Sequence, residues 1–373
     1  MTNDWSYHNP VNVRFGTDAI ATIAGDLNGA RYAVVTYDEP FFSDIVGKLA
    51  KATGAAEIVI NDVRPNPDCG HLGTQTARIW SLPHEVDVIV AIGGGSVIDT
   101  AKVLAAGRNG FEAVLEPVRD GRTPANLSPL PLIAVPTTAG TGSEVTCWAT
   151  IWDEAAGAKY SLAHPHLYPR TAMIDPMLML GKSVELTRAT GLDALSHALE
   201  SIWNKNANPV SARHAVFAAR TILRDLPRLL SAPGDLSLRA SMAEAALSAG
   251  LAFSNTKTAI AHNISYPVTL GYGIAHGIAC AFTLPTALRS LPPLGGFQDA
   301  AFANIFGAGN QSGADQLAVY LREMGVGVSF RDHGVDRTEA EEIIEAAFLG
   351  QRGKNFIGTK DALFAAAQDD GLI

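Results

Sequence analysis

The chain has 373 residues, of which 47% are hydrophobic and 17% are charged, and its formal net charge is −9. This composition indicates a globular protein with a substantial core and excludes a disordered chain. The negative charge argues against nucleic acid or an anionic membrane as the main partner, because both require a basic surface. The length favours two domains of ordinary size.

The first residues, MTNDWSYHNPVNVRFG, show neither the basic region nor the apolar core of a secretion signal. No apolar run is long enough to cross a membrane. We therefore expect a soluble, cytoplasmic protein with no membrane partner. The three cysteines, Cys69, Cys147 and Cys280, are widely spaced and indicate buried free thiols rather than disulfides or a zinc knuckle.

Short apolar runs alternate with helical patterns in the first half of the chain and predict parallel strands joined by helices. The stretch 107–131 predicts an irregular surface loop. From about residue 180 the pattern changes to long Ala/Leu-rich helical periodicity. We expect an α/β domain with a parallel sheet over residues 1–180 and an all-α domain over residues 181–373. The predicted strands are YAVVTY (32–37), AAEIVI (55–60), VDVIVAI (86–92) and LPLIAVP (130–136).

The segment VDVIVAIGGGSVIDTAK (86–102) runs from a buried strand through three glycines into a helix. Gly94 and Gly95 allow a close backbone approach, and Ser96 stands at a helix N-terminus, where the dipole favours phosphate. The pattern is neither G-x-G-x-x-G nor a P-loop. A structural glycine turn capped by Ser96 is the alternative. Asp99 would repel phosphate, so we expect it to bind a hydroxyl or to cap amides.

The loop PTTAGTGSEVT (136–146) follows the next predicted strand and is rich in hydroxyl groups and glycine. Two such loops at the carboxyl ends of parallel strands belong on the ligand-binding edge of a doubly wound sheet. A solvated turn is the alternative, and a dinucleotide is the ligand that fits this edge.

Four residues of the second half form a candidate metal set. Asp193 and His197 in GLDALSHALE are four positions apart and share one helical face, while His262 and His276 follow among apolar neighbours. A buried imidazole requires a partner. One carboxylate and three imidazoles suit Fe(II) or Zn(II). A core histidine bonded to a carboxylate one turn away is the alternative for the Asp193–His197 pair.

The motifs GGGSVIDTAK, PTTAGTGSE, GLDALSHALE and AHGIACAFTLP resemble, in this order, those of the iron-containing alcohol dehydrogenase family, over nearly the whole chain. The resemblance implies an N-terminal dinucleotide-binding domain, a helical metal-binding domain, NAD or NADP as cofactor, and a homo-oligomer such as a dimer. It implies Asp193, His197, His262 and His276 as metal ligands. The cofactor-binding residues that it implies are Asn66, Gly94, Gly95, Ser96, Asp99, Thr137, Thr138, Ser143, Thr146 and Lys159.

Two positions depart from the family pattern. In VVTYDEP, Tyr37 stands where many relatives carry an aspartate, and Asp38 follows one position later. Carboxylates near the ribose accept from its hydroxyls and repel an added phosphate, so Asp38 and Glu39 favour NAD over NADP. Tyr266 stands where many relatives have a histidine near the nicotinamide. Its phenol is a candidate for the catalytic proton path, and packing against the metal-bearing helix is the alternative.

Lys257 precedes His262 by five positions, on what the pattern indicates is the same helix, and is flanked by two threonines. A cation among hydroxyl groups near a metal favours an anionic substrate tail and makes Lys257 a second candidate catalytic residue. The run TKT also resembles the branch that reduces phosphonoacetaldehyde to 2-hydroxyethylphosphonate. Five positions turn a side chain about 140° away from His262 unless the helix begins after Lys257, and a solvent-facing lysine is the alternative.

The predicted function is metal-dependent, NAD(P)-linked hydride transfer between the nicotinamide and a small aldehyde or primary alcohol. A metal-dependent lyase of the dehydroquinate synthase type is one alternative, and it would need a basic cluster for a phosphorylated acid. A non-catalytic nucleotide-binding protein is the other, and it would not need a complete metal set. Four intact ligand candidates favour the dehydrogenase.

Overall fold

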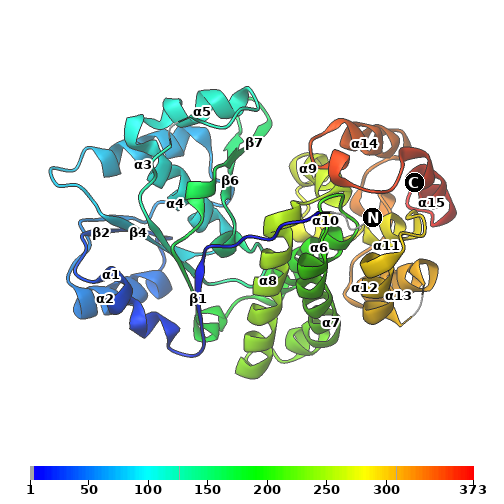
Figure 1. Ribbon diagram of the computed structural model, residues 1–373, viewed down its shortest axis with the longest axis horizontal. Helices are drawn as coiled ribbons and strands as arrows, with labels where there is room; N and C mark the ends of the chain where they lie inside the picture. The colour runs from blue at the N-terminus through cyan, green and yellow to red at the C-terminus, as the bar shows by residue number, and fades with distance from the viewer. Residues whose placement is uncertain (1–3, 126, 308) are drawn as a thin grey trace. The chain divides into compact units, whose positions relative to one another are not determined.

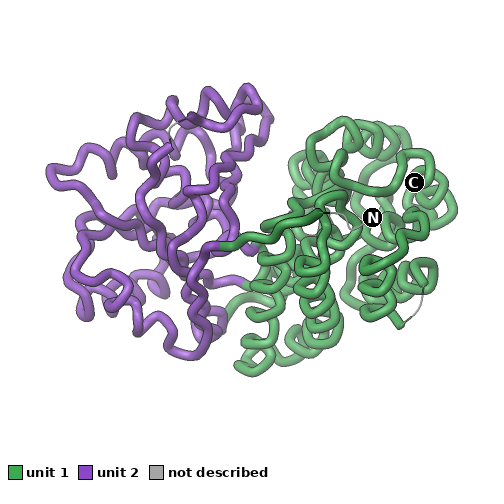
Figure 2. The backbone as a smooth tube through the Cα atoms, in the orientation of Figure 1, with its two compact units in different colours: residues 1–9, 139–141, 181–373 green, residues 10–138, 142–180 purple. Residues whose placement is uncertain are grey.

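The computed structural model describes residues 4–125, 127–307 and 309–373. The chain forms two compact units (Figure 2). One comprises residues 10–138 and 142–180, and the other comprises residues 1–9, 139–141 and 181–373. Residues 4–9 and 139–141, which the sequence assigned to the N-terminal domain, group with the helical unit.

The first unit is built on a six-stranded sheet in which every neighbouring pair is parallel, in the order β1-β8-β5-β4-β2-β3. The predicted α/β class with a parallel sheet is confirmed. The sequence did not predict β1 and β8, which are four-residue strands. The strands are β1 (Asn12–Phe15), β2 (Tyr32–Val35), β3 (Ile58–Ile60), β4 (Val88–Gly93), β5 (Leu132–Pro136) and β8 (Thr171–Ile174).

Alternate residues of the central strands point to opposite faces of the sheet, and each face is covered by helices (Figure 1). Val34 packs with residues of α1 and α2, whereas Val35 packs with residues of α3 and α4. Burial on both faces explains why these strands are continuously apolar. The helices of this unit are α1 (Ile23–Leu27), α2 (Pro40–Thr53), α3 (Cys69–Trp80), α4 (Gly95–Ala106) and α5 (Phe111–Arg119).

The prediction of an irregular loop over 107–131 was wrong in part, because α5 lies inside it. Its buried residues, Phe111, Val114, Leu115 and Val118, follow the helical spacing that an amphipathic helix requires. Pro117 and the glycines at both ends concealed this pattern. An antiparallel hairpin of β6 (Trp148–Asp153) and β7 (Ala158–Ala163) also belongs to this unit.

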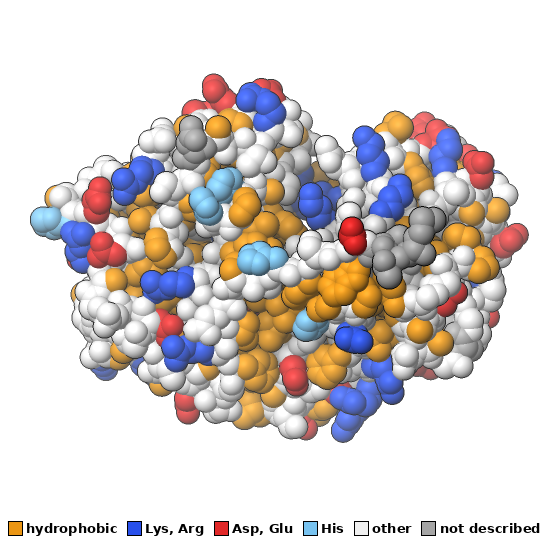
Figure 3. All heavy atoms as spheres, viewed as in Figure 1, with side chains coloured by type: hydrophobic (Ala, Val, Ile, Leu, Met, Phe, Trp, Pro, Cys, Tyr) orange, Lys and Arg blue, Asp and Glu red, His pale blue; other side chains and the backbone are white. Residues whose placement is uncertain are grey.

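The second unit is helical, as predicted, and one continuous hydrophobic core joins its helices. In the described part of the chain, no helix combines the length and the apolarity that crossing a bilayer requires. On the face drawn in Figure 3, acidic and basic side chains are interspersed. The helices are α6 (Val184–Ile202), α7 (Pro209–Ser231), α8 (Leu236–Thr256), α9 (Ile260–Tyr272), α10 (His276–Ala281), α11 (Leu284–Arg289), α12 (Gly296–Phe306), α13 (Asn310–Glu323), α14 (Arg337–Leu349) and α15 (Lys360–Asp369).

Candidate functional site

The helix α6 carries Asp193, His197 and Glu200 at spacings of four and three residues, so one face presents all three side chains. All three are buried. The start of α10 packs directly on α6, because a Cβ on Gly277 would lie 1.9 Å from the carbonyl oxygen of Ala189. Glycine at this position therefore lets His276, the preceding residue, reach the same face of α6.

Three imidazoles surround one carboxylate oxygen. Asp193 Oδ1 lies 3.8 Å from His197 Nε2, 3.5 Å from His262 Nε2 and 4.0 Å from His276 Nε2. These distances exceed those of hydrogen bonds. Asp193 Oδ1 and His262 Nε2 are buried and have no hydrogen-bond partner among the described residues. The structure thus brings the four predicted metal ligands together around a group of unsatisfied donor atoms.

A divalent ion fits this arrangement. Two ligand atoms that share a tetrahedral metal at about 2.1 Å lie about 3.4 Å apart, close to the observed separations. An ion would also satisfy Asp193 Oδ1 and His262 Nε2, which otherwise carry the cost of burial without a partner. The donor set of one oxygen and three nitrogens suits Fe(II) or Zn(II) better than calcium or magnesium.

Glu200 holds His262 in place. Its carboxylate accepts from His262 Nδ1 at 2.6 Å and from the backbone amides of Ala259 at 2.8 Å and Ala261 at 2.6 Å. Burial alone would raise the pKa of Glu200, but His262 and the two amides outweigh it and hold this pKa below its ordinary value. An ionised carboxylate only accepts hydrogen bonds, so Nδ1 of His262 donates to Glu200, and Nε2 is the ring nitrogen that faces Asp193 and the cluster.

The charges of the cluster are set by its own members. Burial would raise the pKa of Asp193, but His197, His262 and His276 hold it below its ordinary value, so the carboxylate is ionised. Burial lowers the pKa of His197 to about 4, which keeps its imidazole neutral at physiological pH. Burial would lower the pKa of His262, but Cys280, Glu200 and Asp193 hold it well above its ordinary value, so a metal bound at Nε2 would displace a proton from this ring.

Cys280 and Tyr266 complete the surroundings of His276. Cys280 is a buried free cysteine one turn further along α10, and its Sγ lies 3.7 Å from His276 Nε2. The donor atoms of Asp193, His262, His276 and Cys280 lie within 4.8 Å of one another. The ring of Tyr266 stacks on that of His276 with 6.0 Å between centroids and 2° between planes. The sequence identified neither Cys280 nor Glu200 as part of this site.

Lys257 is not on the helix of His262, so that part of the sequence interpretation was wrong. It is the exposed C-cap of α8, and α9 begins three residues later at Ile260. Its φ of 64° is a conformation that side chains other than glycine rarely adopt, and its carbonyl accepts from Asn204 Nδ2 at 3.1 Å. The connection between α8 and α9 is therefore a tight, tethered turn.

In the first unit, the two predicted cofactor loops leave neighbouring strands at the same end of the sheet. The last residues of β4 and β5, Gly93 and Pro136, are paired, and the amide of Thr137 donates to the Gly93 carbonyl at 3.0 Å. A Cβ on Gly94 would lie 3.3 Å from Thr138 Oγ1. Strand order reverses beside β4, because β2 and β3 lie on its other side. Such a switch point is where doubly wound sheets bind ligands.

Further predicted cofactor residues are arranged around this edge. The amide of Asn66, whose φ is 57°, donates to Ser96 Oγ at 3.3 Å, so these two predicted residues are in contact. Asp38 is exposed after β2 and accepts from Asn61 Nδ2 at 2.8 Å. The ammonium group of Lys159 lies 4.8 Å from the ring centroid of Trp152.

Several hydroxyl and carboxyl groups of the predicted cofactor-binding residues form hydrogen bonds with other protein groups. Asp99 accepts from Ser143 Oγ at 2.6 Å and from the amide of Thr150 at 2.8 Å. The fully buried Lys102 donates to the Ser143 carbonyl at 2.7 Å and to Thr146 Oγ1 at 3.1 Å. Burial lowers the pKa of Lys102 to about 8. These bonds fasten the hydroxyl-rich loop to α4, and Thr137 and Thr146 are themselves buried.

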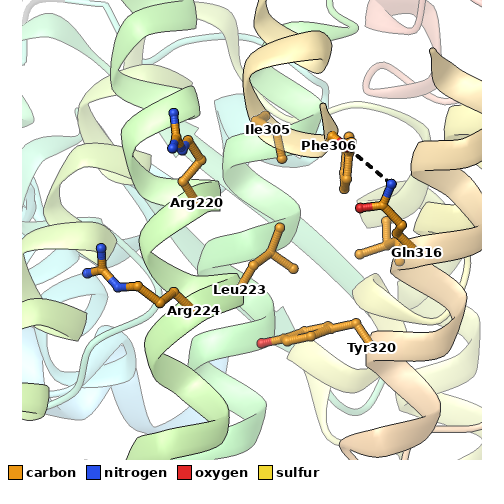
Figure 4. A pocket seen from close by; sticks show the side chains of 8 residues that line it. Arg220, Leu223, Arg224, Ile305, Phe306, Gln316 and Tyr320 are labelled. Atoms are coloured by element: carbon orange, nitrogen blue, oxygen red, sulfur yellow. Dashed lines mark hydrogen bonds between the residues drawn. The ribbon is translucent and has the colours of Figure 1, made fainter. Parts of the chain in front are cut away.

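A pocket in the helical unit lies apart from these residues. It is formed by side chains of α7, α12 and α13, and Gln316 closes one side by donating to the Phe306 carbonyl at 3.1 Å (Figure 4). It includes none of the predicted site residues. Its lining is Arg220, Leu223, Arg224, Ile305, Phe306, Gln316, Leu317 and Tyr320.

Comparison with known proteins places both units of the chain in one family. The profile described as iron-containing alcohol dehydrogenase matches residues 10–176, and that of the C-terminal region of the Fe-containing alcohol dehydrogenase family matches residues 187–360. The chain is 31% identical over 340 residues to the NAD-dependent methanol dehydrogenase of Bacillus methanolicus, covering 86% of each chain.

Two further similarities extend this result. Lactaldehyde reductase of Escherichia coli K12 is 28% identical over 348 residues, which cover 89% of this chain and 90% of that protein. The crystal structure of sulfoacetaldehyde reductase from Bifidobacterium kashiwanohense, in complex with NAD+, superposes with a TM-score of 0.89 at 28% identity. That similarity covers 99% of this chain and 98% of the other.

Proposed function

The chain belongs to the iron-containing alcohol dehydrogenase family, and on that premise we propose that it transfers hydride between NAD(H) and a small aldehyde or primary alcohol at a metal site formed by Asp193, His197, His262 and His276. The observation that carries the proposal is the ring of imidazole nitrogens around the unsatisfied Asp193 Oδ1. When bound, a divalent metal supplies Lewis acidity toward the substrate oxygen, and the nicotinamide supplies or accepts hydride.

The residues of the helical unit prepare this chemistry. Glu200 fixes the tautomer of His262, and the burial of Asp193, His197 and His262 excludes water from their donor atoms. We assign to the Tyr266 hydroxyl the exchange of a proton with the substrate oxygen, because its ring stacks on the partly exposed His276. Burial raises the pKa of Tyr266, so its hydroxyl is protonated at neutral pH and can donate.

The residues of the first unit bind the dinucleotide in this proposal. The amides at the start of α4, after Gly94, face the pyrophosphate, and Asn66, Ser96, Thr138 and Lys159 contact the rest of the cofactor. Asp99, Thr137, Ser143 and Thr146 support these contacts from within the loop. The exposed carboxylate of Asp38 favours NAD over NADP, and a relative named NAD-dependent supports that preference.

For the substrate we propose a short aldehyde with an anionic tail, such as phosphonoacetaldehyde, and Lys257 is kept as one proposed contact for this tail. The similarity to a sulfoacetaldehyde reductase supports this class, since the aldehyde named there also carries an anionic group. Two other classes of function compete, namely a lyase of the dehydroquinate synthase type and a nucleotide-binding protein without catalysis. The cluster of Asp193 and three histidines argues against a nucleotide-binding protein without catalysis, because such a protein would not need a complete metal site.

One assay separates the three functions. Metal-free protein is mixed with NADH and a panel of charged and uncharged aldehydes, with and without Fe(II) or Zn(II), and the absorbance of NADH is followed. A dehydrogenase oxidises NADH only when both metal and aldehyde are present. A lyase or a binding protein leaves the absorbance unchanged with every aldehyde, and that result would refute the proposal.

A further inference from the structure

Arg352 lies beside the candidate metal cluster and has no carboxylate partner among the described residues. The guanidinium carbon of Arg352 lies 4.9 Å from the ring centroid of Tyr266. The residue is half-buried, and its side chain forms no ion pair or hydrogen bond with another described residue. Arginines in such positions are normally paired, so the guanidinium group has donors to spare.

Arg352, Tyr266 and His276 form a stack that leads from the protein surface to the metal cluster. The guanidinium lies over one ring, and that ring is parallel to the imidazole of His276. The imidazole Nε2 lies 4.0 Å from Asp193 Oδ1. The carboxylates of the cluster, Asp193 and Glu200, are buried and lie against the histidines, and neither forms an ion pair with Arg352.

The segment that carries Arg352 is fastened to the helix of His262 and Tyr266. Asn263 on α9 donates from Nδ2 to the carbonyl of Ala347 at the end of α14. Gly350 and Gly353 permit this close packing, because a Cβ on Gly350 would lie 2.2 Å from Asn263 Nδ2, and one on Gly353 would lie 2.0 Å from the Ala347 oxygen. The guanidinium is therefore held on a fixed backbone, which lowers the entropic cost of binding a ligand.

We infer that Arg352 binds the anionic tail of the substrate, so that the enzyme selects short aldehydes carrying a sulfonate, phosphonate or carboxylate group. A planar guanidinium donates two parallel hydrogen bonds to any of these oxyanions, and stacking on Tyr266 orients it in advance. This inference rests on the proposed function, and it names the residue that would make the site specific for charged aldehydes.

The test compares Arg352→Met with the wild type on sulfoacetaldehyde, phosphonoacetaldehyde, succinic semialdehyde and the uncharged propionaldehyde. We expect KM for the charged aldehydes to rise about 10- to 100-fold, because one charged hydrogen-bonded pair is lost. The kcat values, and both kcat and KM for propionaldehyde, should stay within about twofold of the wild-type values. Arg352→Lys should recover part of the affinity, because it keeps the charge but loses the fork. Lys354→Met, at an exposed neighbouring position, should change nothing.

A binding measurement separates recognition from turnover. Isethionate, the alcohol that corresponds to sulfoacetaldehyde, should bind the wild-type holoenzyme in a calorimetric titration and bind Arg352→Met at least about tenfold more weakly. Equal effects of Arg352→Met on charged and uncharged aldehydes, or none on either, would overturn the inference while leaving the dehydrogenase proposal intact. Failure of the wild type to oxidise NADH with any aldehyde would instead refute the proposed function.

Discussion

Glu200 and His262 are joined by a hydrogen bond of 2.6 Å between Oε2 and Nδ1, although 62 positions separate them in sequence. Among the described residues, Glu200 accepts four hydrogen bonds, three from backbone amides and one from the His262 imidazole. The pair fixes which nitrogen of His262 faces the metal cluster. The carboxylate therefore acts through His262, as a positioning residue.

Replacing Glu200 by Gln should weaken metal retention about 10- to 100-fold, because the amide nitrogen of glutamine would face donors and release the His262 ring. Competition with a chelator measures this directly, and it does not depend on turnover. The melting temperature should also fall, since a buried donor would be left without an acceptor. Wild-type metal affinity in Glu200→Gln would show that His262 is oriented without the carboxylate.

Replacing His262 or His276 by Ala should strongly weaken metal binding while leaving the far-UV circular dichroism unchanged, because it removes one of the four proposed protein ligands. Cys280→Ala is the matched control on α10, and it should retain one metal per chain because the four proposed ligands remain. Elemental analysis after dialysis distinguishes them. Full occupancy in a histidine variant would remove that histidine from the ligand set.

Gly95→Val should weaken NADH binding more than metal binding. Gly95 is the first residue of α4, where a branched side chain would occupy the space that a pyrophosphate needs at the helix N-terminus. Gly25→Ala in α1 is the control, because a Cβ there meets nothing within 4 Å. Fluorescence titration with NADH provides the measurement. Equal affinity in both variants would leave the glycines of this loop with a structural role alone.

Asp225 predicts a pH-dependent contribution to stability. It accepts from Arg224 Nη2 at 2.6 Å, from Arg228 Nη1 at 2.9 Å and from Ser241 Oγ at 2.7 Å, and so links α7 to α8. The Arg224 guanidinium is the main cause that lowers the pKa of Asp225 to about 2. Because the folded pKa is below the ordinary value, the contribution is complete at neutral pH and is lost as the pH falls toward 2.

Asp225→Asn should therefore lower the free energy of unfolding by about 1–2 kcal/mol at pH 7. This value allows for solvent screening, because the two arginines that contact Asp225 are exposed. The difference from wild type should shrink between about pH 4 and pH 2. Urea denaturation at several pH values tests this. The exposed pair of Arg337 and Glu341 provides a control, since Glu341→Gln should cost less than about 0.5 kcal/mol. A difference that does not change with pH would contradict the ion-pair explanation.

The parallel sheet and the candidate ligands were predictable because each depends on a local pattern. Strands buried on both faces are continuously apolar, as in β4, and Asp193 and His197 share a helical face by spacing alone. The strands β1 and β8 have only four residues each, which are too few for such a pattern. Pro117 concealed α5, although its apolar residues follow helical spacing.

Contacts between distant segments were not predictable in the same way. Glu200 completes the GLDALSHALE motif on the same face as Asp193, and that spacing was a signal for its role. Nothing in the sequence indicates that Arg352 lies against Tyr266, because the packing of α14 on α9 decides it. The position of Lys257 depended on where α9 begins, and helix boundaries are the least certain part of a sequence-based assignment.

The central claim is that this chain is an oxidoreductase whose activity requires a metal held by Asp193 and three histidines. Chelator-treated protein, assayed with NADH and a short aldehyde, should be inactive, and one equivalent of Fe(II) or Zn(II) per chain should restore NADH oxidation. Asp193→Asn should neither bind the metal nor recover. Full activity in demonstrably metal-free protein, or no NADH oxidation in protein carrying one metal per chain, would contradict the claim.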